Sequence, residues 1–187
     1  MNYIETIKAY EPKNEQEEVD KKAILAFINQ NKDHLYRTNL VAHLTSSAIV
    51  INEAFDKVLF AYHNIYNSWS WLGGHVDGSK NLLNVAIKET KEETGIKTVR
   101  PYSKDIFMID VIQVENHVKN YQYVPDHLHL NVTYLLIADE RETLSVKIDE
   151  NQDVKWFEIK RVLNYVTEER MKKIYQKAFD AIKQFKD

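Results

Sequence analysis

The chain has 187 residues, the size of one domain with additional segments, and its net charge of −3 argues against a general nucleic-acid-binding protein, which would carry a basic excess. The absence of cysteine excludes disulfides, thiolate metal sites and cysteine nucleophiles. Residues 1–16 lack the basic start and apolar centre of a signal peptide, and no apolar run approaches the ~20 residues that span a bilayer. We therefore expect a soluble cytoplasmic protein without membrane contact.

The first predicted element is a helix from Asn14 to about Asn31. Asn14 is a suitable N-cap, and Glu17 three residues later resembles a capping box. The apolar stripe of this helix consists of Val19, Ala23, Ile24, Phe27 and Ile28. We expect residues 1–38 to form a helical appendage, which packs on the main domain at residues 39–187 or makes a dimer contact.

Short strands are predicted at residues 48–51 and 58–61, separated by a polar loop. Trp69 and Trp71 alternate with serines and lead into Gly73 and Gly74, where the backbone can approach other groups closely. The two tryptophans share one face of this segment. They could stack on a nucleobase or serve as structural packing, and we regard both as open.

A second helix should begin near Asn81 after a turn and end at Thr94, with Gly95 as its C-terminal stop. Leu83, Ala86 and Ile87 should form its buried face.

The same helix carries three carboxylates, at Glu89, Glu92 and Glu93. At about 100° per residue, Glu89 and Glu93 lie one turn apart and Glu92 lies beside them. Like charges at this spacing destabilise a helix by a few tenths of a kcal/mol per pair, and a hard divalent cation such as Mg²⁺ or Mn²⁺ would reverse that effect. A solvated helix face is the competing interpretation.

The second half of the chain should add strands at residues 106–114, 127–136 and 154–157, and a helix at 168–185. Residues 115–126 are predicted to be a loop of functional length. Thr167 should cap the last helix, whose apolar stripe is Met171, Ile174, Tyr175, Ala178, Ile182 and Phe185. Strands with helices before, between and after them indicate an α/β fold.

The strand that starts at His127 alternates strictly, so that its polar side chains share one face: His127, His129, Asn131 and Thr133. That face is either solvent-exposed or the floor of a substrate cleft, which makes His127, His129 and Asn131 candidate substrate-binding residues. His129 could also act as a general base. A His-x-His pair can bind zinc, but the sequence shows no evident third ligand.

The segment from Gly74 to Ile96 resembles the signature of the Nudix hydrolases, G-x5-E-x7-R-E-U-x-E-E-x-G-U, where U is aliphatic. The positions that match are Gly74, Glu89, Glu92, Glu93, Gly95 and Ile96. Lys80, Lys88 and Thr90 depart from the first Glu, the Arg and an aliphatic residue of the pattern. Weaker resemblance extends over residues 44–159.

This resemblance implies an α/β/α sandwich of the Nudix type with a mixed sheet, plus N-terminal and C-terminal helices. It implies a pyrophosphohydrolase that cleaves a diphosphate linkage in a nucleoside diphosphate joined to another group. Glu89, Glu92 and Glu93 would be catalytic and would bind Mg²⁺ or Mn²⁺, with the Gly73 carbonyl as a further ligand. The related isopentenyl-diphosphate isomerases depend on a cysteine, which this chain lacks.

Glu150 lies six residues before Trp156, a spacing that resembles the one in some members of the family. It could be a metal ligand or the general base, or residues 149–153 could be a simple polar turn. Glu115 is a weaker candidate for the same role.

Lys80 and Lys88 cannot form the brace that the family's Glu and Arg are thought to provide. The alternative function is therefore a catalytically weak ligand sensor or regulatory protein. Either lysine could instead contact phosphate or be solvated. The sequence does not select one nucleotide-type diphosphate, and it leaves open a homodimer formed through the terminal helices.

Overall fold

The computed structural model describes residues 2–119 and 121–185. These residues divide into two compact units, which we describe separately. Unit 1 takes residues 1–47, 73–86 and 104–134, and unit 2 takes residues 48–72, 87–103 and 135–187. Within the described residues, the helices are all too short or too polar to cross a bilayer.

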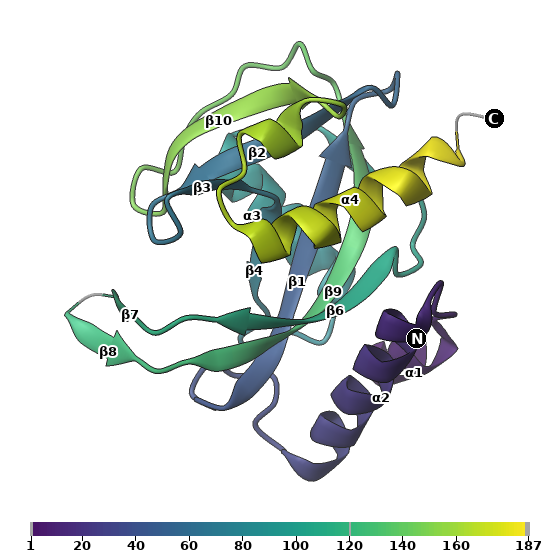
Figure 1. Ribbon diagram of the computed structural model, residues 1–187, viewed down its shortest axis with the longest axis vertical. Coiled ribbons are helices and arrows are strands. Elements are labelled where there is room, and N and C mark those ends of the chain that lie inside the picture. Colours follow the sequence, from purple (N-terminus) through teal and green to yellow (C-terminus); the bar gives the residue numbers. More distant parts are fainter. Residues whose placement is uncertain (1, 120, 186–187) are drawn as a thin grey trace. The chain divides into compact units, whose positions relative to one another are not determined.

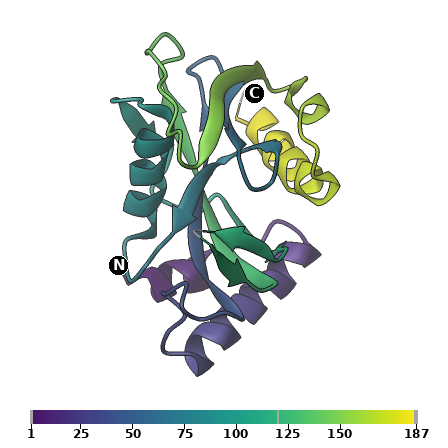
Figure 2. The same ribbon diagram turned by 90° about the vertical axis from the view of Figure 1, so that its left-hand side faces the viewer.

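Unit 1 begins with helices α1 (Tyr3–Ala9) and α2 (Glu15–Gln30), which lie side by side (Figures 1 and 2). The predicted cap of α2 is confirmed, because the Asn14 side chain accepts a hydrogen bond from the Glu17 amide at 2.9 Å. The Glu17 side chain is fully buried, and its Oε2 accepts from the Tyr10 hydroxyl at 2.7 Å and from the Lys13 amide at 2.8 Å. Glu17 therefore ties α2 to the segment before it. The expected stripe was wrong at Val19, which is 57% exposed, and at Ala23, which is also exposed.

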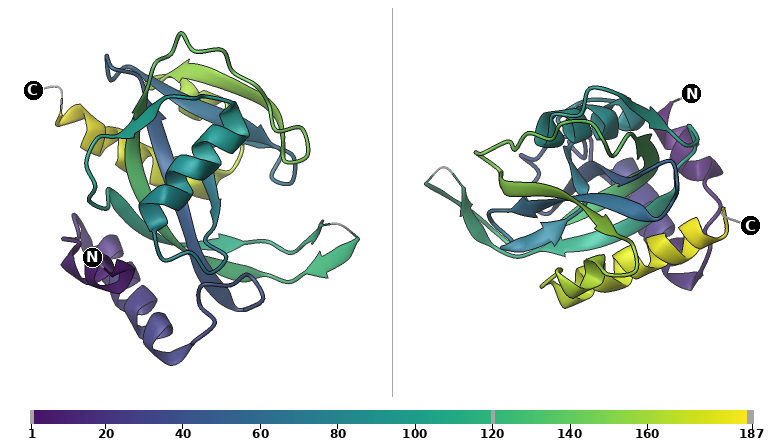
Figure 3. Two further views of the ribbon diagram at one scale, coloured as in Figure 1. Left: turned by 180° about the vertical axis from the view of Figure 1, so that it is seen from behind. Right: turned by 90° about the horizontal axis from the view of Figure 1, so that it is seen from above.

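The strands of unit 1 come from β1 (Ala42–Ile51), β4 (Leu72–His75), β6 (Met108–Val114) and β9 (His127–Ala138), of which β1, β4 and β9 continue into unit 2. β6 pairs antiparallel with β9 from Met108↔Thr133 to Val114↔His127. The segment expected to be a loop at 115–126 instead contains the hairpin β7 (His117–Lys119) and β8 (Gln122–Val124), which prolongs β6 and β9 (Figures 1 and 3).

Unit 2 is built around β2 (Lys57–His63), which pairs antiparallel with β1, with β3 (Ser68–Ser70) and with β10 (Asn151–Glu158). β5 (Val99–Pro101) pairs with the end of β9. The order of the main sheet is β10-β2-β1-β9-β5. The Leu128 amide, near the start of β9, donates to the Val41 carbonyl, just before the start of β1. Because the two neighbouring strands β1 and β9 begin side by side, they run in the same direction, and the sheet is mixed.

Helix α4 (Glu169–Lys183) and the part of helix α3 (Leu82–Thr94) from residue 87 onward cover the strands of unit 2 on opposite faces. α4, preceded by the 3₁₀ turn η1 (Val162–Asn164), faces the viewer in Figure 1, and α3 faces the viewer on the left of Figure 3. Tyr175 and Phe179 of α4 lie against Phe60 of β2, with ring centroids 4.9 and 6.5 Å apart. This layering confirms the predicted α/β class.

The boundaries of α4 differ from the prediction. Glu168 is the N-cap, and the Thr167 hydroxyl donates to the Asn67 carbonyl at 3.2 Å instead of capping the helix. Phe185 lies beyond the helix and is 42% exposed, whereas Phe179 is buried.

Helix α3 ends where the sequence predicts. Gly95 has a φ of +71°, and a Cβ there would lie 2.0 Å from the Ser145 Oγ, so both the turn and the neighbour require glycine. The buried face of α3 differs from the prediction, since Leu83 and Ile87 are half-buried and the fully buried side chains include Leu82, Val85, Ala86 and Thr90.

Candidate functional site

The three candidate glutamates lie on the last two turns of α3, in unit 2, and differ in burial. Glu93 is 5% exposed, and its Oε2 is 3.5 Å from the Asn151 side-chain nitrogen of β10. The side chains of Glu89 and Glu92 are 14% and 42% exposed. The helix therefore presents a graded row of carboxylates, from buried Glu93 to exposed Glu92.

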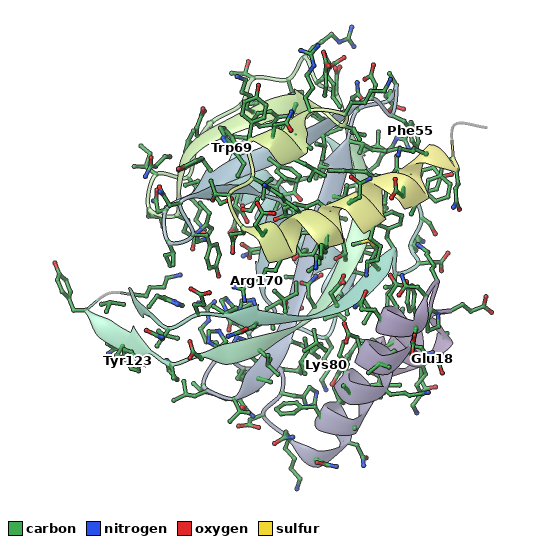
Figure 4. All side chains as sticks on the ribbon, viewed as in Figure 1. Glu18, Phe55, Trp69, Lys80, Tyr123 and Arg170 are labelled. Atoms are coloured by element: carbon green, nitrogen blue, oxygen red, sulfur yellow. The ribbon has the colours of Figure 1, made fainter. Side chains whose placement is uncertain are left out.

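Lys88 lies between two of these carboxylates. Its Nζ is 3.2 Å from Glu89 Oε1 and 3.1 Å from Glu92, and these two hydrogen bonds raise the pKa of Lys88 above its ordinary value. Lys88 is thus not simply solvated, because its ammonium group neutralises part of the charge that a metal ion would otherwise balance. Lys80, by contrast, is exposed at the surface (Figure 4).

Glu150, in the turn before β10, is connected to the same cluster. Its Oε2 is 2.9 Å from the Lys147 Nζ, which in turn is 4.0 Å from Glu92 Oε2. Burial alone would lower the pKa of Lys147, but its bond to Glu150 and the charge of Glu89 raise it. Lys88 and Lys147 thus connect Glu89, Glu92 and Glu150 in one charged network within unit 2. Glu93 lies on the same helix, and its described contact is with Asn151, the residue after Glu150.

The candidate substrate-binding tryptophans of unit 2 contact aromatic side chains. The Trp69 ring meets the Tyr62 and Phe157 rings edge-on, at centroid distances of 5.5 and 4.7 Å. The Trp71 ring lies 5.4 Å from Tyr175, whose hydroxyl accepts from the Trp71 amide at 3.4 Å. Both rings therefore have the contacts of structural packing, and each keeps a partly exposed surface.

Gly73, the predicted backbone ligand, belongs to unit 1. Its φ is +150°, and a Cβ at this position would lie 2.5 Å from the Ser47 Cα. A side chain here would collide with the backbone of β1, so the strand pairing itself requires glycine.

Asn131, another substrate-binding candidate, is 1% exposed. Its Oδ1 accepts from the Thr45 and Ser47 hydroxyls at 2.8 and 2.9 Å, and its Nδ2 donates to Thr133 Oγ1 at 3.0 Å. The polar face of β9 is thus neither solvent-exposed nor open at this point. It is a buried hydrogen-bond network between β1 and β9.

His127 and His129 lie in a cluster of imidazole rings in unit 1. His43 of β1 and His75 of β4 join them. The ring centroid of His75 lies 5.0 Å from those of His43 and His129. The ring centroid of His129 lies 5.1 Å from those of His43 and His127. Ligand atoms of His43, His75 and His129 lie within 4.8 Å of one another. The group contains His129 but not His127, so the His-x-His pair itself is not the ligand set. Strand pairing brings the other two members, His43 and His75, from parts of the chain that are remote in the sequence.

Three of these histidines are held in the neutral form. Burial lowers the pKa of His43, and it lowers that of His75 to about 3, helped by the positive charge of Arg37. Burial also lowers the pKa of His129 well below its ordinary value, and the neighbouring histidines add to this effect. Neutral imidazole is the form that binds metals, and it is also unsuited to bind a phosphate through charge.

Comparisons with known proteins agree with this fold. The sequence matches the NUDIX domain family over residues 42–178. A Lactococcus lactis protein named "Probable DHNTP pyrophosphohydrolase" is 33% identical over 100 residues, which are 53% of this chain and 56% of that protein. The match thus spans little more than half of the relative.

Solved structures show the same fold at low identity. A NUDIX hydrolase from Clostridium perfringens has a TM-score of 0.55 at 22% identity, covering 74% of this chain and 96% of that one. The Escherichia coli dihydroneopterin triphosphate pyrophosphohydrolase has a TM-score of 0.53 at 14% identity, and the match covers 76% of this chain and 93% of that one. A Caenorhabditis elegans Ap4A hydrolase has a TM-score of 0.52 at 17% identity, and the match covers 71% of this chain and 93% of that one. The family match covers well over half of the chain, and we conclude that this protein belongs to the NUDIX domain family.

Proposed function

We propose that this protein is a divalent-metal-dependent pyrophosphohydrolase, which cleaves a diphosphate linkage in a small nucleotide-type substrate. The observation that carries the proposal is the group of carboxylates at the C-terminal end of α3 and in the turn before β10. Lys88 and Lys147 link Glu89, Glu92 and Glu150, and the buried Glu93 contacts Asn151, the residue after Glu150. Membership of the NUDIX domain family supports it.

The residues present fit a hard cation. The donors are carboxylate oxygens, which Mg²⁺ and Mn²⁺ prefer. The ammonium group of Lys88 already bridges Glu89 and Glu92, which shows that this position favours positive charge. Beside Glu93, the buried Oδ1 of Asn151 has no hydrogen-bond partner among the described residues, which leaves an oxygen available for a metal-bound water.

We assign the ion to Glu89, Glu92 and Glu93 of unit 2. When bound, the ion polarises the phosphoryl oxygens and lowers the pKa of a coordinated water. The Asn151 side-chain nitrogen, 3.5 Å from Glu93 Oε2, orients this carboxylate. Glu150 is our candidate for the general base, which would accept a proton from the attacking water. The ion pair with Lys147 holds the Glu150 carboxylate in position.

For the substrate side, the exposed parts of Trp69 and Trp71 remain candidates for stacking on a base, whereas the amide of Asn131 is already committed to its buried neighbours. His127 and His129 are better explained by the imidazole cluster. The names of the relatives suggest dihydroneopterin triphosphate and Ap4A as the first substrates to test.

The test is release of phosphate, pyrophosphate or nucleoside monophosphate from a panel of substrates, with Mg²⁺, Mn²⁺ or EDTA. The panel includes dihydroneopterin triphosphate, Ap4A, nucleoside triphosphates, ADP-ribose and nucleotide sugars. We expect turnover of one class, its loss in EDTA, and a fall of at least about 100-fold in kcat for Glu93→Gln.

Glu158→Gln is the matched control, because it removes a carboxylate from the far end of β10, where its described partners are the exposed Arg161 and the charge of Lys57. Equal activity in Glu93→Gln and in the control would overturn the metal assignment. No turnover of any substrate by folded protein with bound metal would favour a ligand sensor.

A further inference from the structure

The imidazole cluster of unit 1 offers nitrogen ligands, a different chemistry from that of the carboxylates of α3. We propose that His43, His75 and His129 form a second metal site, selective for a borderline divalent ion, and that this ion is Zn²⁺. The inference does not rest on the proposed hydrolase activity.

The backbone holds the three histidines on adjacent strands. The Leu128 amide donates to the Val41 carbonyl at 2.9 Å, and the Val76 amide donates to the Leu44 carbonyl at 3.4 Å. These bonds fix the start of β9 and the end of β4 on either side of the start of β1. His129 and His75 therefore converge on His43 from the two strands that flank it.

His43 is already in the tautomer that a metal requires. Its Nδ1 is 3.0 Å from the Asn39 carbonyl, which can only accept, so Nδ1 carries the proton and Nε2 keeps its lone pair. That Nε2 is buried and has no hydrogen-bond partner among the described residues. An orphaned buried acceptor is costly and needs an explanation, which a metal bond supplies. A histidine that binds a metal through one ring nitrogen usually donates the N–H of the other nitrogen to a group such as a backbone carbonyl.

His127 plays the same positioning role for His129. Its Nδ1 donates to the Pro125 carbonyl at 2.8 Å, so in neutral His127 the Nε2 is an acceptor. The Nε2 of His129 lies 3.2 Å away and donates to it, which leaves the lone pair of His129 on Nδ1. Hydrogen bonding thus fixes the tautomer of two of the three ligands.

The ligand set selects the class of ion. Three imidazoles without a carboxylate in the group suit Zn²⁺, and disfavour Mg²⁺, Ca²⁺ and Mn²⁺, which prefer oxygen. Tetrahedral Zn²⁺ with bonds of about 2.0–2.1 Å needs nitrogens roughly 3.3 Å apart. Because the ligand atoms lie within 4.8 Å of one another, binding requires a contraction of about 1.5 Å at most, through rotation of the rings. Three protein ligands leave a fourth position for water.

The experiment measures Zn²⁺ binding to untagged protein stripped with EDTA, by equilibrium dialysis and metal analysis. We expect one tightly bound Zn²⁺ per chain, retained in Glu89→Gln/Glu92→Gln, which weakens the carboxylate site. His75→Asn should weaken Zn²⁺ binding more than about 100-fold, because it removes a ligand. His127→Gln should weaken Zn²⁺ binding about 10–100-fold, because His127 orients a ligand and does not bind the ion itself.

His63→Asn is the matched control. His63 is a half-buried strand histidine like His75 but lies on β2 in unit 2, beside Tyr66. The His63→Asn variant should bind Zn²⁺ with unchanged affinity. Equal binding by His75→Asn and His63→Asn, or loss of Zn²⁺ in the double glutamate variant alone, would overturn the proposal.

A measurement on the unaltered chain guards against misfolded variants. Zn²⁺ should shift the ring ¹⁵N resonances of His43, His75 and His129, and Co²⁺ should give the visible absorption of a low-symmetry nitrogen site. Ring resonances that stay in place at saturating Zn²⁺ would equally refute the site.

Discussion

Lys88 offers the sharpest test of how charge is arranged on α3. Its side chain is 62% exposed and forms ion pairs with Glu89 at 3.2 Å and Glu92 at 3.1 Å. Exposed pairs contribute about 0.2–1 kcal/mol each, and their removal also leaves the glutamates to repel one another. We expect Lys88→Ala to lower the free energy of unfolding by about 0.5–1.5 kcal/mol at low salt, less at high salt.

The same substitution should strengthen metal binding. In the unaltered protein a metal ion must displace the Lys88 ammonium group from Glu89 and Glu92. The free energy of these two ion pairs is lost when the metal binds, and the metal therefore binds more weakly than it would without Lys88. A loss of about 1 kcal/mol corresponds to roughly fivefold tighter Mg²⁺ binding. The stability deficit of Lys88→Ala should therefore shrink as Mg²⁺ is added.

The control is Lys91→Ala, which removes the same charge from the same helix and changes helix propensity equally. No ion pair of Lys91 is among those described for this helix. Urea denaturation of both variants, with and without Mg²⁺, gives the two free energies. Identical behaviour of the two variants, or weaker Mg²⁺ binding in Lys88→Ala, would refute the role assigned to Lys88.

Three further predictions concern the unit that carries the histidines. Tyr10→Phe should destabilise the protein by about 1–3 kcal/mol in thermal or urea denaturation, because the buried Glu17 carboxylate loses its 2.7 Å hydrogen bond, and an effect below experimental error would contradict it. Gly73→Ala should cost more than about 2 kcal/mol, since its Cβ would meet the Ser47 backbone at 2.5 Å and its φ of +150° is unfavourable, and a variant of normal stability would show that β1 can yield. Metal-free protein should lose stability as the pH falls from about 6.5 to about 3, because His75 has a pKa of about 6.5 in the unfolded chain and about 3 in the folded chain. Over this range the free energy of unfolding should fall by about 1.4 kcal/mol per pH unit. A His75→Asn variant with the same dependence of stability on pH would argue against this prediction.

Local signals explain what could be predicted from the sequence. Asn14 and Gly95 act on the backbone within a few residues, and both mark the helix ends where expected. The periodicity that placed Glu89, Glu92 and Glu93 on one helix is likewise local. The NUDIX family and the α/β class, both predicted from the sequence, are confirmed.

The features that the sequence did not reveal depend on tertiary contacts. The polar side chain of Asn131 indicated a solvent or cleft face, but hydroxyl groups from β1 satisfy it in the interior. His43 and His75 gave no signal as ligands, because their spacing to His129 along the chain has no meaning until β4, β1 and β9 pair. The strands of the hairpin, β7 and β8, have only three residues each, which is too short for an alternating pattern to indicate a strand.

The departures from the family signature also acquire a physical meaning. A lysine at position 88 pairs with two of the carboxylates that the proposal assigns to the ion. Metal affinity is therefore the property that this substitution should alter first, ahead of the fold. The exposed Lys80 has no comparable contact among those described.

The most direct test of the central claim is a titration with Mn²⁺, in which electron paramagnetic resonance measures the free ion. The proposal predicts that Glu89→Gln/Glu92→Gln weakens Mn²⁺ binding at least about tenfold, whereas Glu158→Gln and His75→Asn bind it like the unaltered protein. Unchanged Mn²⁺ affinity in the double glutamate variant would contradict the account.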